Sequence, residues 1–221
     1  MDFDWSVITD NAAFLIGGLE LTLALSLCSV VMSLALGTAI GLLRCYGPKY
    51  AQLAITFYVD SMRSIPVLVV LVWTYFALPL LTGAVLPPFW AALLALTIHI
   101  AAYVAEIVRA GVSSIRKGQL WAASALGMSQ WQAIRTVIMP QATVRMLPAF
   151  GSVISIAIKD TAIASVIAVP EYMNRSQTVA GQSFHPIEVF TVAMLVYFVV
   201  LFPVTRIVDM VYVRLAHLGR S

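Results

Sequence analysis

The sequence predicts an all-α integral membrane protein with five spans, and the composition, the long charge-free stretches and the turn residues support this fold class. Of the 221 residues, 61% are hydrophobic and only 10% are charged, whereas a soluble domain has about 25% charged residues. The mean hydropathy is +0.95. Because a spanning helix needs about 20 mostly apolar residues, the chain has room for roughly five or six spans and no separate soluble domain. We therefore expect a single domain over residues 1–221.

The gaps between charged residues locate the spans, since a charge that faces lipid is costly. No charge lies between Glu20 and Arg44, and none lies between Arg63 and Glu106. The second gap is long enough for two helices, and turn residues mark its middle: Pro79, Gly83, Pro87 and Pro88. The expected spans cover residues 14–43, 52–80, 88–110, 141–168 and 187–213. A long connection over residues 111–140 joins the third span to the fourth.

Basic residues gather at alternate ends of the expected spans and predict the orientation. Short loops rich in Lys and Arg stay in the cytoplasm. Eleven of the thirteen basic residues lie beside the first and third connections or after the last span: Arg44, Lys49, Arg63, Arg109, Arg116, Lys117, Arg135, Arg145, Arg206, Arg214 and Arg220. The N-terminus, with Asp2, Asp4 and Asp10, is therefore expected outside and the C-terminus inside. The formal charge of +3 is too small and too dispersed for a nucleic-acid-binding surface.

The connection over residues 111–140 is far longer than two helices need, which predicts that something docks there. Gln119 to Leu126 is a run of good helix formers, and Gly127 follows as a helix stop. A second helix is expected from about Gln130 to Met139, because Pro140 lacks an N–H and disfavours helix at the preceding residue. The partly apolar surface of the first helix has two interpretations: contact with another protein, or an amphipathic helix on the inner leaflet.

This connection resembles the EAA loop of ABC importer membrane subunits, whose pattern is Glu-Ala-Ala, three residues, Gly, nine residues and then Ile-x-Leu-Pro. Ala122, Ala123, Gly127 and Pro140 match at that spacing, while Trp121 stands where the pattern has Glu. Other segments are similar to the polar amino-acid uptake permeases, the histidine, glutamine, arginine and glutamate group: GGLELTLALS, YVDSMRSIPVLVVLVW, AYVAEIVRAGVSSIRKGQ, MPQATVRMLPAF and KDTAIASVIAVPE. Several ordered motifs thus carry the resemblance across most of the chain.

The resemblance implies the fold of an ABC type I importer permease and a set of partners. The segment from Gly118 to Gly127 is implied to be a coupling helix in a groove of a cytoplasmic ATP-binding subunit. The implied coupling residues are Gly118, Gln119, Leu120, Trp121, Ala122, Ala123, Leu126, Gly127 and Pro140. A second permease subunit, identical or paralogous, an extracytoplasmic amino-acid-binding protein, a polar amino acid substrate and a bacterial inner membrane are implied as well.

The Walker A pattern G-x-x-x-x-G-K-[ST] is absent from the sequence, although ATP-driven transport requires such a phosphate-binding loop somewhere in the complex. ATP and Mg are therefore expected on a partner ATPase. No cofactor is expected in this chain, and the chain is not expected to be an enzyme.

Lys159 and Asp160 interrupt the fourth span about fourteen residues beyond Arg145, or roughly 20 Å along a helix. Ionisable residues at that depth are functional-site candidates, and neighbours at i and i+1 do not share a helix face. The alternative interpretation is a structural pair bonded to backbone groups or to another helix. Thr161 and Ser165, four positions apart, either line a polar path or bond back to carbonyls one turn earlier.

His99 and Tyr103 stand four positions apart on the third span. A lone membrane histidine is either a bonded packing residue or a ligand, and a free amino acid needs donors and acceptors from several helices. The candidate substrate site consists of Asp160, Thr161, Ser165, His99 and Tyr103, with Lys159 as a secondary member. In this site Asp160 is expected to receive the α-ammonium group or a cationic side chain, because a fixed carboxylate offsets the desolvation of an incoming cation.

Three smaller expectations concern helix contacts. Glu106 with Arg109, and Asp60 with Arg63, have the i, i+3 spacing of ion pairs on one helix. The Gly37-x-x-x-Gly41 spacing predicts close approach of a neighbouring helix. The glycine pair is expected to serve packing.

Two other function classes remain open from the residues alone. A small ion-coupled transporter would use Lys159 and Asp160 as a proton relay, but the long inner connection would then have no task. A membrane enzyme would need a catalytic motif, and the sequence has no H-E-x-x-H, no G-x-S-x-G and no Cys/His set with metal spacing. No metal site is therefore expected. Co-purification of an ATPase would separate the importer from both alternatives.

Overall fold

The computed structural model of the protein describes residues 3–218, and every regular element in that range is helical, as expected for an all-α membrane fold. In chain order the elements are α1 Ser6–Asp10, α2 Ala12–Tyr46, α3 Lys49–Ser64, α4 Val67–Val72, the π-helix η1 Trp73–Ala77, α5 Leu78–Thr82, α6 Pro88–Ser113, α7 Lys117–Ala125, α8 Gln130–Ala133, the π-helix η2 Ile134–Ile138, α9 Met139–Asp160, the 3₁₀-helix η3 Thr161–Ile167, α10 Tyr172–Ser183 and α11 Pro186–Leu218.

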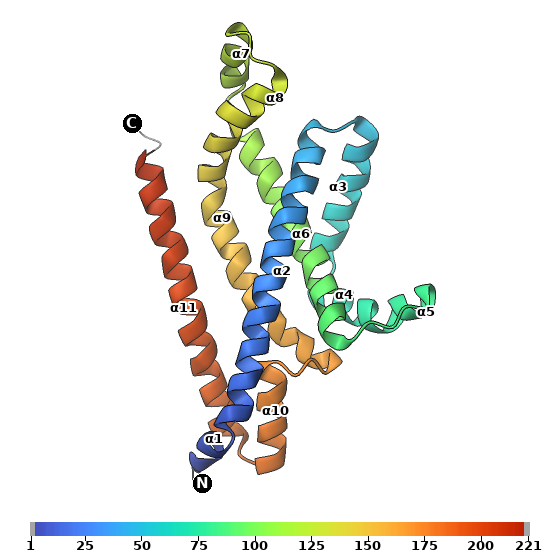
Figure 1. Cartoon of the computed structure of the whole chain (residues 1–221), viewed down its shortest axis with the longest axis vertical. Helices are drawn as coiled ribbons and strands as arrows, with labels where there is room; N and C mark the ends of the chain where they lie inside the picture. The colour runs from blue at the N-terminus through green and yellow to red at the C-terminus, as the bar shows by residue number, and fades with distance from the viewer. Residues whose placement is uncertain (1–2, 219–221) are drawn as a thin grey trace.

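Four helical stretches are long and apolar enough to cross a membrane alone: α2, α6, the run Gln130–Ile167, and Pro186–Val208 within α11. A further pair, α3 and the segment Val67–Thr82, is long and apolar enough only when taken together, and its two halves meet at 107°, the geometry of a broken span or a re-entrant loop. The helix expected over 52–80 is thus broken near its middle, and Figure 1 shows α5 running outward from the bundle while α4 stays against α6. Pro66 causes the break, since it lacks an N–H and holds Ile65 in an extended conformation (φ −95°, ψ 131°).

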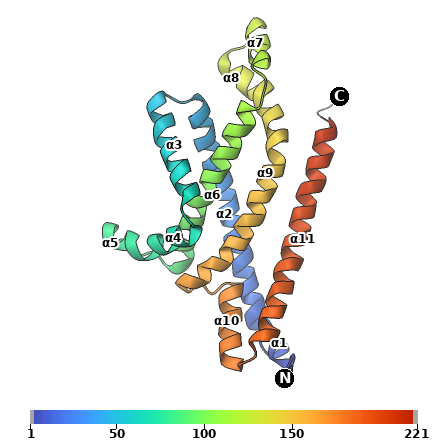
Figure 2. The ribbon, with the colours of Figure 1, turned by 180° about the vertical axis from the view of Figure 1, so that it is seen from behind.

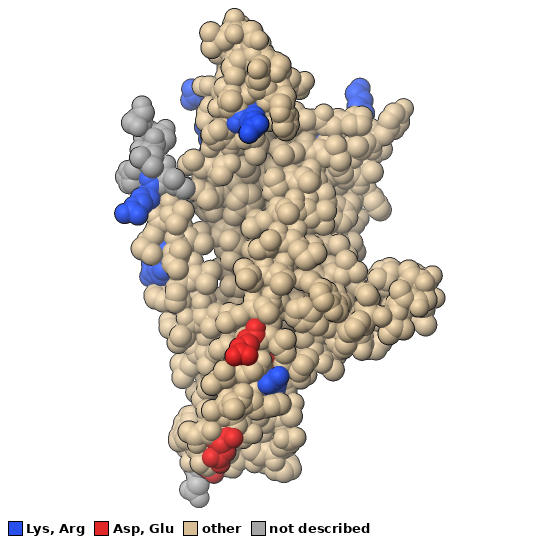
Figure 3. Space-filling model, in the orientation of Figure 1, with Lys and Arg blue, Asp and Glu red and all other residues tan. Residues whose placement is uncertain are grey.

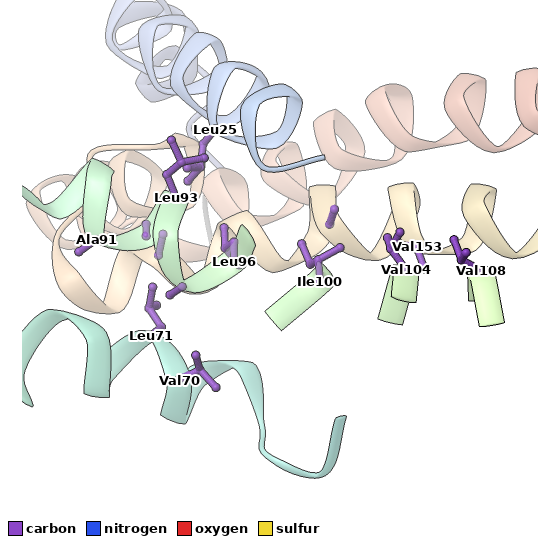
Figure 4. Packing of buried hydrophobic residues seen from close by; sticks show 14 of the residues in the cluster. Leu25, Val70, Leu71, Ala91, Leu93, Leu96, Ile100, Val104, Val108 and Val153 are labelled. Carbon is purple, nitrogen blue, oxygen red and sulfur yellow. The ribbon is translucent and has the colours of Figure 1, made fainter. Parts of the chain in front are cut away.

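α6 is the central helix, and α2, α3, α4 and α9 pack around it (Figures 1 and 2). Its buried side chains interdigitate with those of its neighbours: Figure 4 shows Leu25 of α2 beside Leu93, and Val153 of α9 beside Val104. Lipid tails are as apolar as these side chains, so close van der Waals packing, and not burial from water, favours the contact between helices.

Two glycines bring α2 close to α6, which confirms the expectation from their spacing. Gly37 faces Val104, and Gly41 faces Val108, so closely that a Cβ atom at either glycine would overlap the valine. Because α6 also forms one wall of the polar cavity described below, this seam fixes the position of that wall.

The helix expected to end near Met139 continues into α9, so that expectation was wrong. The N–H of Met139 bonds the carbonyl of Ile134, five residues earlier, which makes the turn before Pro140 wider than an α-turn. The wide turn leaves room for the pyrrolidine ring, and Pro140 then occupies the first turn of α9, where a missing N–H costs little. The sequence predicted that Pro140 ends a helix, whereas it lies in the first turn of α9.

The two ends of the molecule differ. α7 and α8 form one end, the N-terminus lies at the opposite end, and α11 runs back toward the end that carries α7 (Figure 1). Termini at opposite ends fit an odd number of crossings. Figure 3 shows Lys and Arg side chains mostly over the half with α7, α8 and the end of α11, and Asp and Glu side chains toward the other end.

At the end opposite α7, Glu171 and Arg175 fasten α10 to α2. Glu171 is fully buried. Its carboxylate accepts hydrogen bonds from two backbone N–H groups of the first turn of α10, from the Thr22 hydroxyl at 3.2 Å and from the Tyr197 hydroxyl at 3.3 Å. Arg175 donates to the carbonyl of Phe14 at 2.6 Å. This buried carboxylate therefore has protein partners for both of its oxygens.

Candidate functional site

A polar cavity of about 490 Å³ lies among α3, α4, α6 and α9, a volume within the range of small-molecule sites. Its lining residues come from all four helices and from the break between α3 and α4: Arg63, Ser64, Ile65, Pro66, Val67, His99, Ile100, Tyr103, Val153, Ile156 and Asp160. Three of the six residues proposed from the sequence, namely His99, Tyr103 and Asp160, share this cavity.

Local backbone features place these residues around one space. Pro66 ends α3 and turns the chain, so the residues on either side of the break form one wall. His99 and Tyr103 lie one turn apart on α6, and their ring centroids are 5.4 Å apart. Asp160 is the last residue of α9, at the point where the α-helix tightens into η3. The break after α3, the end of α9 and the continuous helix α6 thus all border this cavity.

The cavity presents polar groups that the described part of the chain leaves without partners. His99 is only 5% exposed, and its Nδ1 atom has no hydrogen-bond partner. The side chains of Asp160 and Arg63 make no hydrogen bond with the residues that the structure describes, although the Arg63 guanidinium lies 3.9 Å from the Glu106 carboxylate. An unpaired buried polar group costs free energy, so the His99 ring nitrogen is suited to a polar ligand, and the half-buried Asp160 and the more exposed Arg63 add charges of opposite sign to the same cavity.

An ion cluster lies beside the cavity and involves three helices. Glu106 of α6 receives the guanidinium of Arg44 at 2.6 Å and that of Arg109 at 2.5 Å. Arg63 lies 3.9 Å from the same carboxylate, and Asp60 lies 3.9 Å from Arg44. The expected pair of Glu106 with Arg109 is confirmed. The expected pair of Asp60 with Arg63 was wrong, because both side chains turn toward partners on other helices.

Lys159 lies apart from the first cavity. It lines a second cavity of about 290 Å³ between α9 and α11, together with Ser152, Ser155 and Thr205. The Oγ atom of Ser155 there is buried and has no hydrogen-bond partner in the described structure. The two neighbouring charges of α9 thus face different spaces, as expected for positions i and i+1.

Thr161 and Ser165 do not line either cavity. Thr161 is fully buried and donates to the carbonyl of Ile158 at 2.7 Å. The carbonyl of Ser165 accepts from the side chain of Asn174 at 3.4 Å. Both residues belong to the 3₁₀-helix η3, in which positions i and i+3 align, so the face expected from α-helical spacing does not exist.

Sequence reasoning missed Arg63 and Ser64 as members of the cavity wall. From the sequence alone, Arg63 was paired with Asp60 on its own helix, so Arg63 was not considered as a residue that could bind a ligand. The signal that finds it is Pro66, because a proline within an apolar stretch interrupts the helix and leaves the preceding residues at a helix end.

The connection between α6 and η2 presents an apolar surface at one end of the molecule. α7 begins two residues before the expected start, and Gly127 has φ +76°, the left-handed conformation of a helix stop. Trp121, Leu126 and Trp131 are 69%, 82% and 66% exposed. Of the remaining loop residues named from the sequence, Ala123 is buried, Leu120 is half-buried, and the exposed ones are Gly118, Gln119, Ala122, Gly127 and Pro140.

Apolar helices that cross a membrane around a polar cavity, with an apolar-faced helical loop at one end, define a polytopic membrane permease. Comparison with known proteins agrees with this class. The chain belongs to the family described as binding-protein-dependent transport system inner membrane component, which matches residues 32–217.

Relatives in this family are similar over nearly the whole chain. The glutamine transport system permease protein of Escherichia coli (strain K12) is 36% identical over 90% of this chain and 92% of its own length. The probable glutamine ABC transporter permease of Bacillus subtilis (strain 168) is 38% identical over 90% of this chain and 93% of its own. The arginine transport system permease protein of that bacterium is 32% identical over 94% of both chains.

Solved structures are similar as well. A chain from the crystal structure of an amino acid ABC transporter with histidines has a TM-score of 0.89 and 31% identity, over 97% of this chain and 100% of that chain. The inward-facing MetNI methionine ABC transporter has a TM-score of 0.79 at 20% identity, over 92% of this chain and 97% of that chain. The second likeness concerns the fold alone.

Proposed function

We propose that the protein is the permease subunit of an ATP-driven ABC importer for polar amino acids. The observation that carries this proposal is the cavity between α6 and α9, where Asp160, His99 and Tyr103 meet. Relatives named for glutamine, arginine and glutamate/aspartate transport support the same substrate class. The particular amino acid is left open.

Asp160 is the residue proposed to receive a cationic group of the substrate. Its carboxylate has no hydrogen-bonding partner among the described residues, although it faces a cavity inside the membrane. An isolated charge there is costly, and an α-ammonium group or a cationic side chain would offset that cost. His99 adds an unpartnered ring nitrogen to the same wall.

Coupling to a separate ATPase is proposed at α7. Trp121 and Leu126 are large apolar side chains exposed at the end of the molecule, which is typical of a surface that contacts another protein. ATP and Mg would bind to that partner, whose contact with α7 would transmit its movement to η2 and α9. The end with α7 is proposed to be cytoplasmic, with the N-terminus outside, because Lys and Arg gather at the cytoplasmic side.

Further partners follow from the same proposal. A second permease subunit, identical or paralogous, would cover the polar face of α9 at Lys159, which is exposed at a depth where lipid would be a poor neighbour. An extracytoplasmic amino-acid-binding protein would deliver substrate to the end that carries α10. The location is a bacterial inner membrane.

The ion-coupled alternative fits the geometry less well. A proton relay needs groups in contact or bridged by water, whereas Lys159 and Asp160 line different cavities. The apolar face of α7 would also have no task in such a transporter.

Purification of the tagged protein from its native membrane tests the partner assignment. We expect a Walker A ATPase to co-purify, and we expect reconstituted uptake to require both that ATPase and ATP. Full uptake by the purified permease alone would refute the proposal.

A pair of variants tests the role of Asp160. If this carboxylate holds substrate, Asp160→Asn assembles normally and retains receptor-stimulated ATP hydrolysis, yet loses uptake of its best substrate or changes its preference. If the carboxylate only braces Lys159 or another helix, Asp160→Asn lowers expression and thermal stability, and the double variant Lys159→Met with Asp160→Asn restores uptake. Restored uptake would overturn the site assignment while leaving the transporter assignment intact.

A further inference from the structure

Arg63 presents a guanidinium to the cavity that the described part of the chain leaves without a hydrogen-bond acceptor. An arginine offers five N–H donors in a fixed fork, and none of those of Arg63 is used by a described residue. Two weaker interactions hold it in the described structure: its Cζ atom lies 5.8 Å from the centroid of the Tyr103 ring, and its Nη1 atom lies 3.9 Å from the Glu106 carboxylate. The side chain is 40% exposed.

Glu106 makes no hydrogen bond to Arg63, since its carboxylate lies 3.9 Å from that guanidinium and already accepts three hydrogen bonds from two other arginines. Arg44 donates to Oε2 at 2.6 Å, and Arg109 donates to both oxygens at 2.5 and 3.1 Å. The cluster contains three guanidinium groups, on Arg44, Arg63 and Arg109, against two carboxylates, on Glu106 and Asp60. One positive charge is therefore in excess, and Arg63 is the member of the cluster that lines the cavity.

The cavity thus contains a positive group, Arg63 of α3, and a negative group, Asp160 of α9. The two form neither an ion pair nor a hydrogen bond with each other. A fork of N–H donors matches a carboxylate in geometry and charge. A ligand that carries only an ammonium group would leave Arg63 without an anion, and a ligand that carries only a carboxylate would leave Asp160 without a cation.

We propose that Arg63 binds the carboxylate of the substrate, while Asp160 binds its ammonium group, so that the cavity recognises a zwitterion in one fixed direction. This inference rests on the proposed function and assigns the carboxylate end to the break between α3 and α4. The Glu106 carboxylate attracts the Arg63 guanidinium and keeps it beside the cavity, but it leaves the N–H groups of Arg63 free to bind a ligand.

Equilibrium binding to the permease–ATPase complex in lipid nanodiscs, without the extracytoplasmic receptor, tests this assignment. The radiolabelled probes are L-glutamine, L-arginine and L-glutamate, and the competitors are the α-carboxamide of each probe, which keeps the ammonium group but lacks the α-carboxylate. We expect the wild type to prefer the amino acid over its α-carboxamide by about tenfold or more, because a charge-assisted fork is lost in the amide.

Arg63→Met should remove this preference, so that the amino acid and its carboxamide compete equally, and Arg63→Lys should retain part of it. Arg109→Met is the matched control. It removes one positive charge from the same cluster, at a side chain that is also 40% exposed, but Arg109 does not line the cavity and its loss should leave the preference unchanged.

The outcomes separate this inference from the proposed function. If the wild type binds neither these three amino acids nor any other polar amino acid, the proposed function fails. If the wild type binds one of them and Arg63→Met prefers it over the carboxamide as strongly as the wild type does, the role of Arg63 is refuted and the permease assignment stands. If Arg63→Met does not elute as an intact complex in gel filtration, Arg63→Gln and Arg63→Lys decide by the same ratio.

Discussion

Replacing Gly41 with alanine tests whether the seam between α2 and α6 is as tight as the structure indicates. A Cβ at this position would lie 2.7 Å from the Cβ of Val108 and 2.8 Å from the carbonyl oxygen of Ala105. Ordinary contacts begin at 3.4 Å, so these approaches are about 0.7 and 0.6 Å too short. Neither atom can rotate away, since one is helix backbone and the other is the branch point of a β-branched side chain.

The expected magnitude follows from two opposing effects. Overpacking of this kind costs about 1–3 kcal/mol, while the change from glycine to alanine favours the helix by about 0.8–1 kcal/mol. We expect a net destabilisation of about 1 kcal/mol. Gly181→Ala is the matched control, because this glycine lies in α10 and a Cβ there meets nothing within 4 Å. It should stabilise the protein by about 0.5–1 kcal/mol.

Thermal unfolding in detergent, followed by far-UV circular dichroism, measures both variants against the wild type. The same chemical change should shift the midpoint in opposite directions at the two sites. Equal midpoints for Gly41→Ala and Gly181→Ala would refute the packing argument, because the helix-propensity gain is common to both and only the seam distinguishes them.

Three further predictions concern coupling, topology and pH. Gly127→Val should reduce ATP-driven uptake while leaving substrate binding intact, because a β-branched residue at φ +76° is strained; an undiminished uptake rate contradicts the role of the helix stop. The orientation can be tested with an impermeant maleimide and single cysteines introduced into a variant without its native cysteines. A cysteine at position 4 should be labelled in intact cells, and a cysteine at position 219, outside the described residues, only after lysis. The reverse pattern overturns the orientation. Burial raises the pKa of the Glu171 carboxyl, which lies between two spans, above its ordinary value of 4.5. Its contribution to stability is therefore full below that value and lost as the pH rises through the folded-state pKa. Relative to the non-titrating variant Glu171→Gln, the thermal unfolding midpoint of the wild type should therefore fall between about pH 4 and about pH 7. A difference between the two midpoints that does not change with pH would show that this carboxyl has the same pKa in the folded and unfolded protein.

Much of the fold could be predicted from the sequence because lipid imposes strong local rules. Charge-free stretches mark α2, α6 and α11, and the two glycines of α2 predict its close approach to α6. The errors fall at prolines. Pro66 breaks a span that was expected to be continuous, and Pro140 begins a helix that it was expected to end. A proline fixes its own φ and removes one N–H, but the neighbouring turn decides whether it stops, bends or starts a helix.

The candidate site was only partly predictable. His99, Tyr103 and Asp160 were found because an ionisable or polar group within an apolar stretch is unusual. Arg63 was missed because a neighbour on its own helix offered a simpler partner. Thr161 and Ser165 were included on α-helical spacing, and the 3₁₀ winding of η3 turns them elsewhere.

The sequence by itself determined that this chain is a helical membrane protein, where its apolar spans lie and which polar residues are placed at membrane depth, because each of these depends on local transfer free energies. Only the tertiary structure decided which of those residues share a cavity. Asp160 and Lys159 are adjacent in the chain but line different spaces, whereas Asp160 and Arg63 are far apart in the chain and line the same one. Helix direction, the break at Pro66 and the packing around α6 set these relations, and they depend on contacts between distant segments.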